Sequence, residues 1–142
     1  MILRNLTRLK LEFELKPVPH QSVRFTRAGR PWKPKKIIDF QKTVSKLAKA
    51  QLSKGFNIIP AGTEIHIAQL TYQYAYLKSI PKKKRIGKLY KTAKPDLQDN
   101  LNKAFIDALE GVVFEQDQNI VTINNLEKYY GDKDLITLIL DY

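Results

Sequence analysis

The chain has 142 residues, of which 43% are hydrophobic, with no cysteine and a formal net charge of +11. These values fit one domain, residues 1–142, with a single core, and they exclude a disulfide framework and thiolate chemistry. No apolar run reaches the length of a transmembrane helix or resembles the apolar region of a signal peptide, so we expect a cytoplasmic protein without membrane partners.

The first third of the chain predicts a strand, a basic turn region and a helix. Apolar and polar residues alternate strictly over residues 9–15, which predicts a half-buried strand. The next segment is rich in turn residues, and its Phe25 and Trp32 could stack on bases or fill the core. Its cations could contact phosphates, and we take them as candidate DNA-binding residues: Arg24, Arg27, Arg30, Lys33 and Lys35.

Residues 35–54 carry apolar side chains at helical spacing and precede Gly55, so we expect a helix there. One face should pack in the core. The lysines of another face should be solvated: Lys42, Lys46 and Lys49.

The middle of the chain predicts a second strand and a basic loop. Residues 63–76 are rich in Ile, Thr and Tyr, and their alternation slips between Ile67 and Ala68, which indicates a bulge. His20 and His66 have no metal-binding partner nearby in the sequence, so structural roles are favoured for both. Residues 81–88 form a charge run that is either a solvated loop or a contact to the DNA backbone. Its candidate DNA-binding residues are Lys82, Lys83, Lys84, Arg85 and Lys88.

Residues 94–111 form the most informative stretch. Its apolar residues recur at spacings of three and four, as on one helix face: Leu97, Leu101, Ala104, Phe105, Ala108 and Leu109. Its polar residues share the opposite face: Asp96, Asp99, Asn100, Lys103 and Asp107. These acids could serve only the helix dipole, with Lys103 and Asp107 as a surface pair. They could instead form a carboxylate site, to which Asp117 would fold back if the connection is tight.

The end of the chain predicts two strands. Residues 120–130 and 135–140 flank a turn at Gly131 and Asp132, which predicts a C-terminal β-hairpin. Strands and helices are thus mixed along the chain, and the predicted fold class is α+β.

The charge is unevenly distributed. Residues 1–94 hold 22 Lys and Arg against 4 Asp and Glu, a net +18, whereas residues 95–142 hold 3 against 10, a net −7. A basic field attracts polyanions, but an acidic cluster within it would repel phosphates unless a cation lay between them. The asymmetry therefore favours a metal-dependent protein that acts on nucleic acid.

Residues 94–100 with Lys103, followed by residues 107–111 and 117–120, resemble the RusA family of Holliday junction resolvases. Residues 17–26 and 34–36 also resemble the opening of that family. The resemblance implies a mixed β-sheet with helices packed against it, and a homodimeric, Mg²⁺-dependent endodeoxyribonuclease, with Mn²⁺ as an alternative metal. Such enzymes resolve four-way DNA junctions by paired nicks, use no small-molecule cofactor, and are common on phages and prophages.

The resemblance also implies roles for single residues. Asp96, Asp99 and Asp117 would be the catalytic, metal-binding carboxylates, and Lys103 the catalytic lysine. Mg²⁺ held by carboxylates can activate a water, and a lysine one helical turn after Asp99 can stabilise developing negative charge. Asn100 would orient a carboxylate or a metal-bound water, and Asp107 would support the metal site from outside it or pair with Lys103.

Two departures from the family pattern matter. The family usually has Asp-x-Asp-Asn, whereas Gln98 adds a residue here, and Gln116 replaces the first of two paired acids. The extra residue either turns Asp96 by about 100° on the helix or bulges in the preceding loop; we favour the bulge, with Gln98 directed away from the metal. Two other classes stay open: a nucleic-acid-binding protein that has lost catalysis, and a basic structural protein of a nucleoprotein particle.

Overall fold

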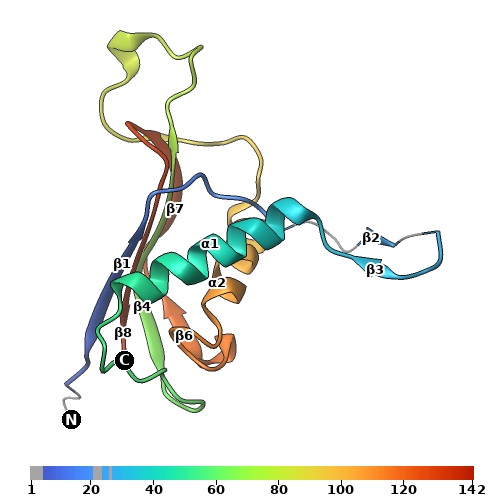
Figure 1. Ribbon diagram of the computed structural model, residues 1–142. Helices are drawn as coiled ribbons and strands as arrows, with labels where there is room; N and C mark the ends of the chain where they lie inside the picture. The colour runs from blue at the N-terminus through green and yellow to red at the C-terminus, as the bar shows by residue number, and fades with distance from the viewer. Residues whose placement is uncertain (1–4, 21–23, 26) are drawn as a thin grey trace.

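Six strands form one mixed sheet, and two helices pack against it (Figure 1). The computed structural model describes residues 5–20, 24–25 and 27–142. The order along the sheet is β1 (Arg8–Phe13), β8 (Leu135–Asp141), β4 (Ile65–Ala75), β7 (Leu126–Gly131) and β5 (Leu89–Tyr90), and β6 (Ile120–Ile123) also pairs with β4. The helices are α1 (Lys35–Gln51) and α2 (Asn102–Leu109). The expected α+β fold with a mixed sheet is confirmed.

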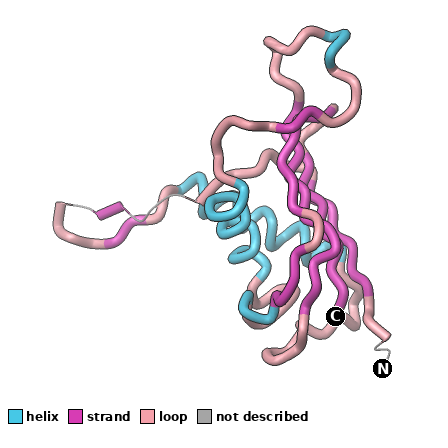
Figure 2. Tube along the Cα trace, turned by 180° about the vertical axis from the view of Figure 1, so that it is seen from behind, coloured by secondary structure: helices cyan, strands magenta, loops and turns pink. Residues whose placement is uncertain are grey.

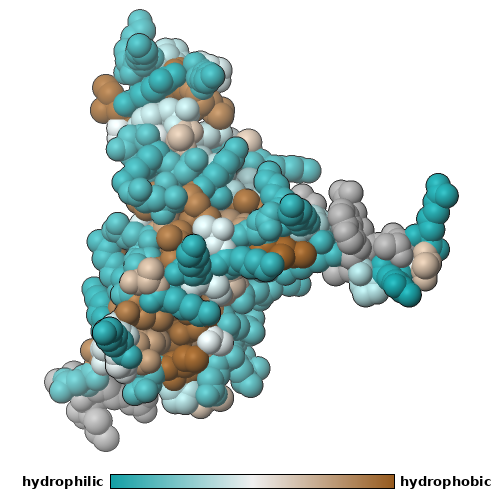
Figure 3. Space-filling model, viewed as in Figure 1, coloured by the Kyte–Doolittle hydropathy of each residue, from teal (hydrophilic) through white to brown (hydrophobic). Residues whose placement is uncertain are grey.

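Two extensions project from this body, as the front and back views show (Figures 1 and 2). One is an arm in which β2 (Arg24–Phe25) pairs antiparallel with β3 (Pro31–Trp32). The other is a loop after β4 that contains the short helix η1 (Lys82–Lys84). Hydrophilic side chains project from both extensions (Figure 3). No helix of the described residues is both long and apolar enough to cross a membrane.

The strands follow the predicted alternation. In β1, Leu11 and Phe13 are buried while Lys10 and Glu12 are exposed. The central strand β4 pairs antiparallel with β8 and parallel with β6 and β7, so its backbone is bonded on both sides. Its register with β8 shifts between Ile67 and Gln69, which confirms the predicted bulge.

The predicted C-terminal β-hairpin is wrong. The chain does reverse after Gly131, but β7 and β8 lie on opposite sides of β4 and do not pair with each other. Residues 132–134 cross the end of β4, where the Ala75 N–H donates to Asp134 Oδ1 at 2.9 Å and Gln73 Nε2 donates to the Lys133 carbonyl at 2.8 Å. A turn motif in the sequence predicts that the chain reverses direction, but it does not predict which strands pair. Here β4 lies between β7 and β8, and its backbone groups form hydrogen bonds on both edges.

Buried residues of α1 and α2 attach both helices to the sheet. In α1 these are Ile37, Phe40, Val44 and Ala48. Gln41 Nε2 donates to the Ala104 carbonyl at 3.0 Å, and Ser45 Oγ donates to the Ala108 carbonyl at 2.9 Å. Because both pairs have the same offset, the two helices run in the same direction. The helix predicted over residues 35–54 ends at Gln51, slightly earlier than expected.

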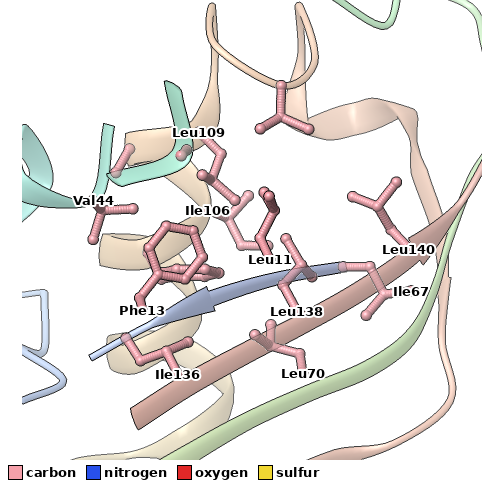
Figure 4. Packing of buried hydrophobic residues seen from close by; sticks show 14 of the residues in the cluster. Leu11, Phe13, Val44, Ile67, Leu70, Ile106, Leu109, Ile136, Leu138 and Leu140 are labelled. Atoms are coloured by element: carbon pink, nitrogen blue, oxygen red, sulfur yellow. The ribbon is translucent and has the colours of Figure 1, made fainter. Parts of the chain in front are cut away.

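Phe105 joins α2 to the sheet. Its ring meets those of Phe13 and Tyr72 edge-on, with centroids 5.1 and 6.0 Å away. Around it the apolar side chains of β1, β4, β8 and both helices point toward one another (Figure 4). With this face of α2 buried, its opposite face is turned to the surface.

Phe105→Ala should destabilise the fold by about 3–5 kcal/mol, because the deletion leaves a cavity where two aromatic contacts are lost. Urea unfolding measures the change. Ile86→Ala is the matched control, since Ile86 is 79% exposed and its loss should cost within about 0.5 kcal/mol. Similar values for the two variants would contradict this account of the core.

Candidate active site

The segment that carries Asp96 and Asp99 begins with a π-helical turn, η2 (Leu97–Leu101), which continues directly into α2. Asp96 precedes it in extended conformation, and the Leu101 N–H donates to the Asp96 carbonyl at 3.1 Å, five residues back. The extra residue, Gln98, is thus absorbed by one wide turn. Neither expected alternative holds: the segment is not a regular α-helix, and Leu97 and Gln98 do not bulge ahead of it.

Two side chains of the sheet hold this segment in place. On β7, Lys128 Nζ donates to the carbonyls of Ala93 at 2.8 Å and Pro95 at 2.6 Å, immediately before Asp96. On β4, the buried Tyr72 hydroxyl donates to Asn102 Oδ1 at 2.8 Å, at the first residue of α2. Burial raises the pKa of Tyr72 well above its ordinary value, so the hydroxyl keeps its proton.

Polar residues of η2 and α2 line an open cavity of about 670 Å³. Asp99, Lys103, Asp107 and Asp117 all face it, while Ile106, Ile120 and Ile123 supply apolar walls. The cavity therefore combines three carboxylates with one ammonium. Asn100 and Gln98 also line it, whereas the sequence-based expectation was that Gln98 points away from the metal.

Asp107, Glu110 and Asp117 form a tighter group. Each offers a carboxylate oxygen that lies within 4.8 Å of the other two, and all three side chains are exposed. Hard divalent cations prefer such oxygen ligands, so the donor set fits Mg²⁺. The group differs from the triad implied by the resemblance, because Asp117 alone belongs to both. Among the described residues, Asp96 belongs neither to this group nor to the cavity lining.

A tight connection returns Asp117 to α2. Gly111 has φ of +78°, a conformation that glycine adopts without strain, and its N–H donates to the Phe114 carbonyl at 2.8 Å. The Asp117 N–H then donates to Glu110 Oε1 at 3.2 Å. The fold-back that the sequence left open thus occurs, and it ends at the last turn of α2.

The three carboxylates repel one another. Glu110 is exposed, yet neighbouring atoms remove part of its hydration, and this loss, with the charges of Asp117 and Asp107, raises its pKa. The hydrogen bond from the Asp117 backbone acts in the opposite direction without cancelling the rise. A bound cation would relieve the repulsion, which is a further physical reason to expect a metal here.

The comparison with known protein families agrees with the geometry. The family model described as Endodeoxyribonuclease RusA matches residues 14–139, nearly the whole chain. The chain belongs to the RusA family. Membership implies the nuclease activity of a Holliday junction resolvase and the binding of branched DNA. A search of the curated proteins gives no match.

In this RusA-family chain, His20 is a cavity residue that the sequence did not single out. Its backbone N–H donates to the Asn100 carbonyl at 2.8 Å, so the segment before the arm attaches to η2. Partial burial and the nearby Lys103 lower the pKa of His20, against the opposing effect of Asp107. The only sequence signal was its place in a proline-flanked turn. His66, by contrast, joins strands, with Nδ1 2.7 Å from Thr122 Oγ1.

The candidate DNA-binding cations fall into the two extensions and the start of α1. Arg27, Arg30, Lys33 and Lys35 are exposed on the arm and at its junction with α1, whereas the side chains of Arg24, Phe25 and Trp32 lie outside the described part. In the other loop Lys82, Lys83 and Lys84 are exposed.

The two remaining DNA-binding candidates of that loop, Arg85 and Lys88, have internal partners. Arg85 Nε donates to the Ile80 carbonyl at 2.8 Å, and its Nη2 donates to the carbonyls of Leu77 and Lys78. Lys88 pairs with Glu127 at 2.6 Å. Arg85 therefore shapes the loop, while the three lysines of η1 extend from it.

Glu110→Gln should stabilise the metal-free protein at about pH 8 and leave it unchanged at about pH 3. A carboxyl with a raised folded-state pKa destabilises the fold at pH values above that pKa, and has no effect below its unfolded-state pKa, where both states are protonated. Thermal unfolding in EDTA at both pH values measures the difference. Gln keeps the acceptor for the Asp117 N–H, so charge alone changes. Equal shifts at both pH values would contradict the repulsion.

Proposed function

We propose that this protein is a Mg²⁺-dependent endodeoxyribonuclease that resolves four-way DNA junctions by paired nicks. The observation that carries the proposal is the gathering of Asp107, Glu110 and Asp117 within 4.8 Å, beside a cavity lined by Lys103, in a chain of the RusA family. Phosphodiester hydrolysis needs an activated water and stabilisation of negative charge, and these residue types supply both with a metal.

Asp117 is the proposed central metal ligand, because it belongs both to the triad implied by the family pattern and to the group that gathers in space. Asp99 is supported by the pattern and by its place in the same cavity. Asp107 and Glu110 are added by proximity to Asp117. Asp96 is supported by the pattern alone. A divalent ion held here, Mg²⁺ or Mn²⁺, would act as a Lewis acid and lower the pKa of a bound water.

Lys103 would stabilise negative charge that develops on the phosphate, since its ammonium lines the cavity with Asp99 and Asp117. Asn100 would orient a carboxylate or a water there. The exposed cations of the arm and of η1 would contact the backbones of the junction arms without reading sequence.

Paired nicks on opposed strands require two active sites, so the proposal includes a homodimer. An apolar strand edge supports it: β6 pairs only with β4 among the described strands, and Val121 and Ile123 on it are 53% and 40% exposed. Ile123 also lines the cavity, so a partner at this edge would lie next to the site. Such an enzyme would act on bacterial or phage DNA in the cytoplasm.

A binding protein that has lost catalysis is the second candidate, and Gln116 is the observation that favours it, since the family usually has an acid there. Gln116 accepts a hydrogen bond from Gln118 Nε2 at 2.7 Å and does not line the described cavity. The replacement of this acid by Gln116 therefore does not remove a carboxylate from the cavity. The nuclease remains the better supported function.

Cleavage of a labelled four-way junction tests the proposal. We expect nicks on opposed strands in Mg²⁺, none in EDTA, and no cutting of the matched linear duplex. Light scattering should give twice the 16.4 kDa mass of one chain. Junctions that bind but stay intact at every metal concentration would support the second candidate instead.

Asp117→Asn and Asp99→Asn should abolish cutting while junction binding persists, because each removes a carboxylate and leaves the basic surface unchanged.

Asp107→Asn and Glu110→Gln should raise the Mg²⁺ concentration needed for cutting. Calorimetric titration of Mg²⁺ measures the affinity for the metal independently. Asp96→Asn should cost less than Asp99→Asn, since Asp96 does not line the cavity. An equal loss would return Asp96 to the ligand set.

Lys103→Ala should slow cutting by about 10²-fold or more if the ammonium stabilises charge in the transition state. Single-turnover cleavage at saturating protein measures the rate without the contribution of binding. Lys54→Ala is the matched control, because Lys54 is exposed and lies outside the cavity. A change of only a few-fold would make Lys103 a surface residue.

A further inference from the structure

A second open groove of about 590 Å³ lies between α1 and α2. One wall carries Lys42, Lys46 and Lys49 of α1, with Lys33 at the N-terminal side of the helix, and the other carries Asp107 and Glu110. These acids are two of the three that gather with Asp117. Asp107 lines both this groove and the site cavity, so the two hollows meet at the candidate metal ligands.

The lysine wall is held by the contacts between the helices. Gln41 and Ser45 donate to the carbonyls of Ala104 and Ala108, which keeps this face of α1 beside the acids of α2. Lys33 Nζ in turn donates to Gln41 Oε1, so its charge lies beside the lysine row. Lys42, Lys46 and Lys49 are all exposed.

The spacing of the row matches a DNA strand. Lys42 and Lys49 are seven residues apart on one helix face, which places them about 10 Å apart along the axis. One strand of a duplex advances about 3.4 Å per phosphate along the helix axis. Where α1 lies along the duplex axis, the row therefore spans about three phosphate-to-phosphate intervals. A strand bound along this row would also lie next to Asp107 and Glu110. A bound cation would remove the repulsion between these carboxylates and the phosphates.

From these observations we infer that the groove between α1 and α2 binds the phosphates next to the nicked bond, and that Lys42, Lys46 and Lys49 guide the strand to the acids. The inference rests on the proposed nuclease function and assigns a role to lysines that the sequence suggested were only solvated. The partner is a duplex arm of the junction, recognised by its backbone charge rather than by its bases.

Junction binding in EDTA, measured over a range of salt concentrations, tests the groove. The triple variant Lys42→Gln, Lys46→Gln, Lys49→Gln should reduce the magnitude of the negative slope of log K against log salt by about 2.7, because each of the three phosphate contacts contributes about 0.9. The control is Lys10→Gln, Lys16→Gln, Lys54→Gln, which removes the same charge from exposed lysines outside the groove. Its slope should change by less than about 1.

Neutral methylphosphonate linkages show which phosphates the row contacts. Two junctions are compared, one with three such linkages on the 5′ side of the nick and one with three on the 3′ side. One of the two should bind the wild-type protein about 10-fold more weakly than the unmodified junction. The triple variant should lose less than about 2-fold from the same linkages, since two changes to one contact are not additive. If the triple variant folds poorly, the single variants Lys46→Gln and Lys49→Gln replace it, and each should reduce the magnitude of the slope by about 1.

The outcomes distinguish a failure of the proposed nuclease function from a failure of the proposed groove. A wild-type protein that neither binds nor cuts junctions overturns the proposed function and the groove with it. A wild-type protein that cuts, with a groove variant whose salt slope equals that of the control, overturns the groove alone. Independent, multiplicative losses from the lysine and methylphosphonate changes would also overturn it.

Discussion

The packing of Phe105 between Phe13 and Tyr72 is the contact on which the rest of the structure depends. It fixes the rotation of α2 about its own axis, because only one face of the helix can be buried against the sheet. Lys103 and Asp107 are then turned outward by geometry alone. The Tyr72 hydroxyl bond to Asn102 sets the position of the helix along the sheet. The candidate site therefore sits on a rigid support, which the proposed catalytic groups would need in order to act on one phosphate.

Charge of opposite sign lies side by side around that helix. Three carboxylates gather at its end, where lost hydration and the charges of Asp117 and Asp107 raise the pKa of Glu110, while the lysines of α1 line the adjacent groove. Neither set alone suits DNA cleavage, since acids repel phosphates, and lysines can bind phosphates but hold no metal. Together they would suit a polyanion that arrives with a divalent cation, because the cation would join phosphate and carboxylate while the lysines would hold the neighbouring phosphates.

The π-turn explains how the chain accommodates its departure from the family pattern. An added residue in a regular α-helix would rotate everything on one side of it by about 100°. The wide turn at residues 97–101 takes up Gln98 locally, so Asp99, Lys103 and Asp107 still line one cavity. The change falls on Asp96, which remains outside the cavity at the extended start of the turn. π-turns often occur at functional sites, where they redirect one or two side chains without disturbing the helix.

The sequence alone determined the periodic features. Alternation placed β1 and β4, including the bulge near Ile67, and the spacing of Leu101, Ala104, Phe105 and Ala108 defined the buried face of α2. The motif at residues 94–103 indicated the family, which the match over residues 14–139 confirms. These features are local, because they depend on the repeat of one helix or strand or on a contiguous motif.

Only the tertiary structure decided what meets across the chain. It placed β4 between β7 and β8, where the turn at Gly131 had predicted a hairpin. It brought Glu110 to Asp117 and His20 to the cavity, and it set the lysines of α1 beside the acids of α2. Side-chain periodicity fixes which face of an element is buried, but not which other element covers it. The neighbours of each carboxylate are set by how helices and strands pack, and that packing is the sum of many weak contacts between distant residues.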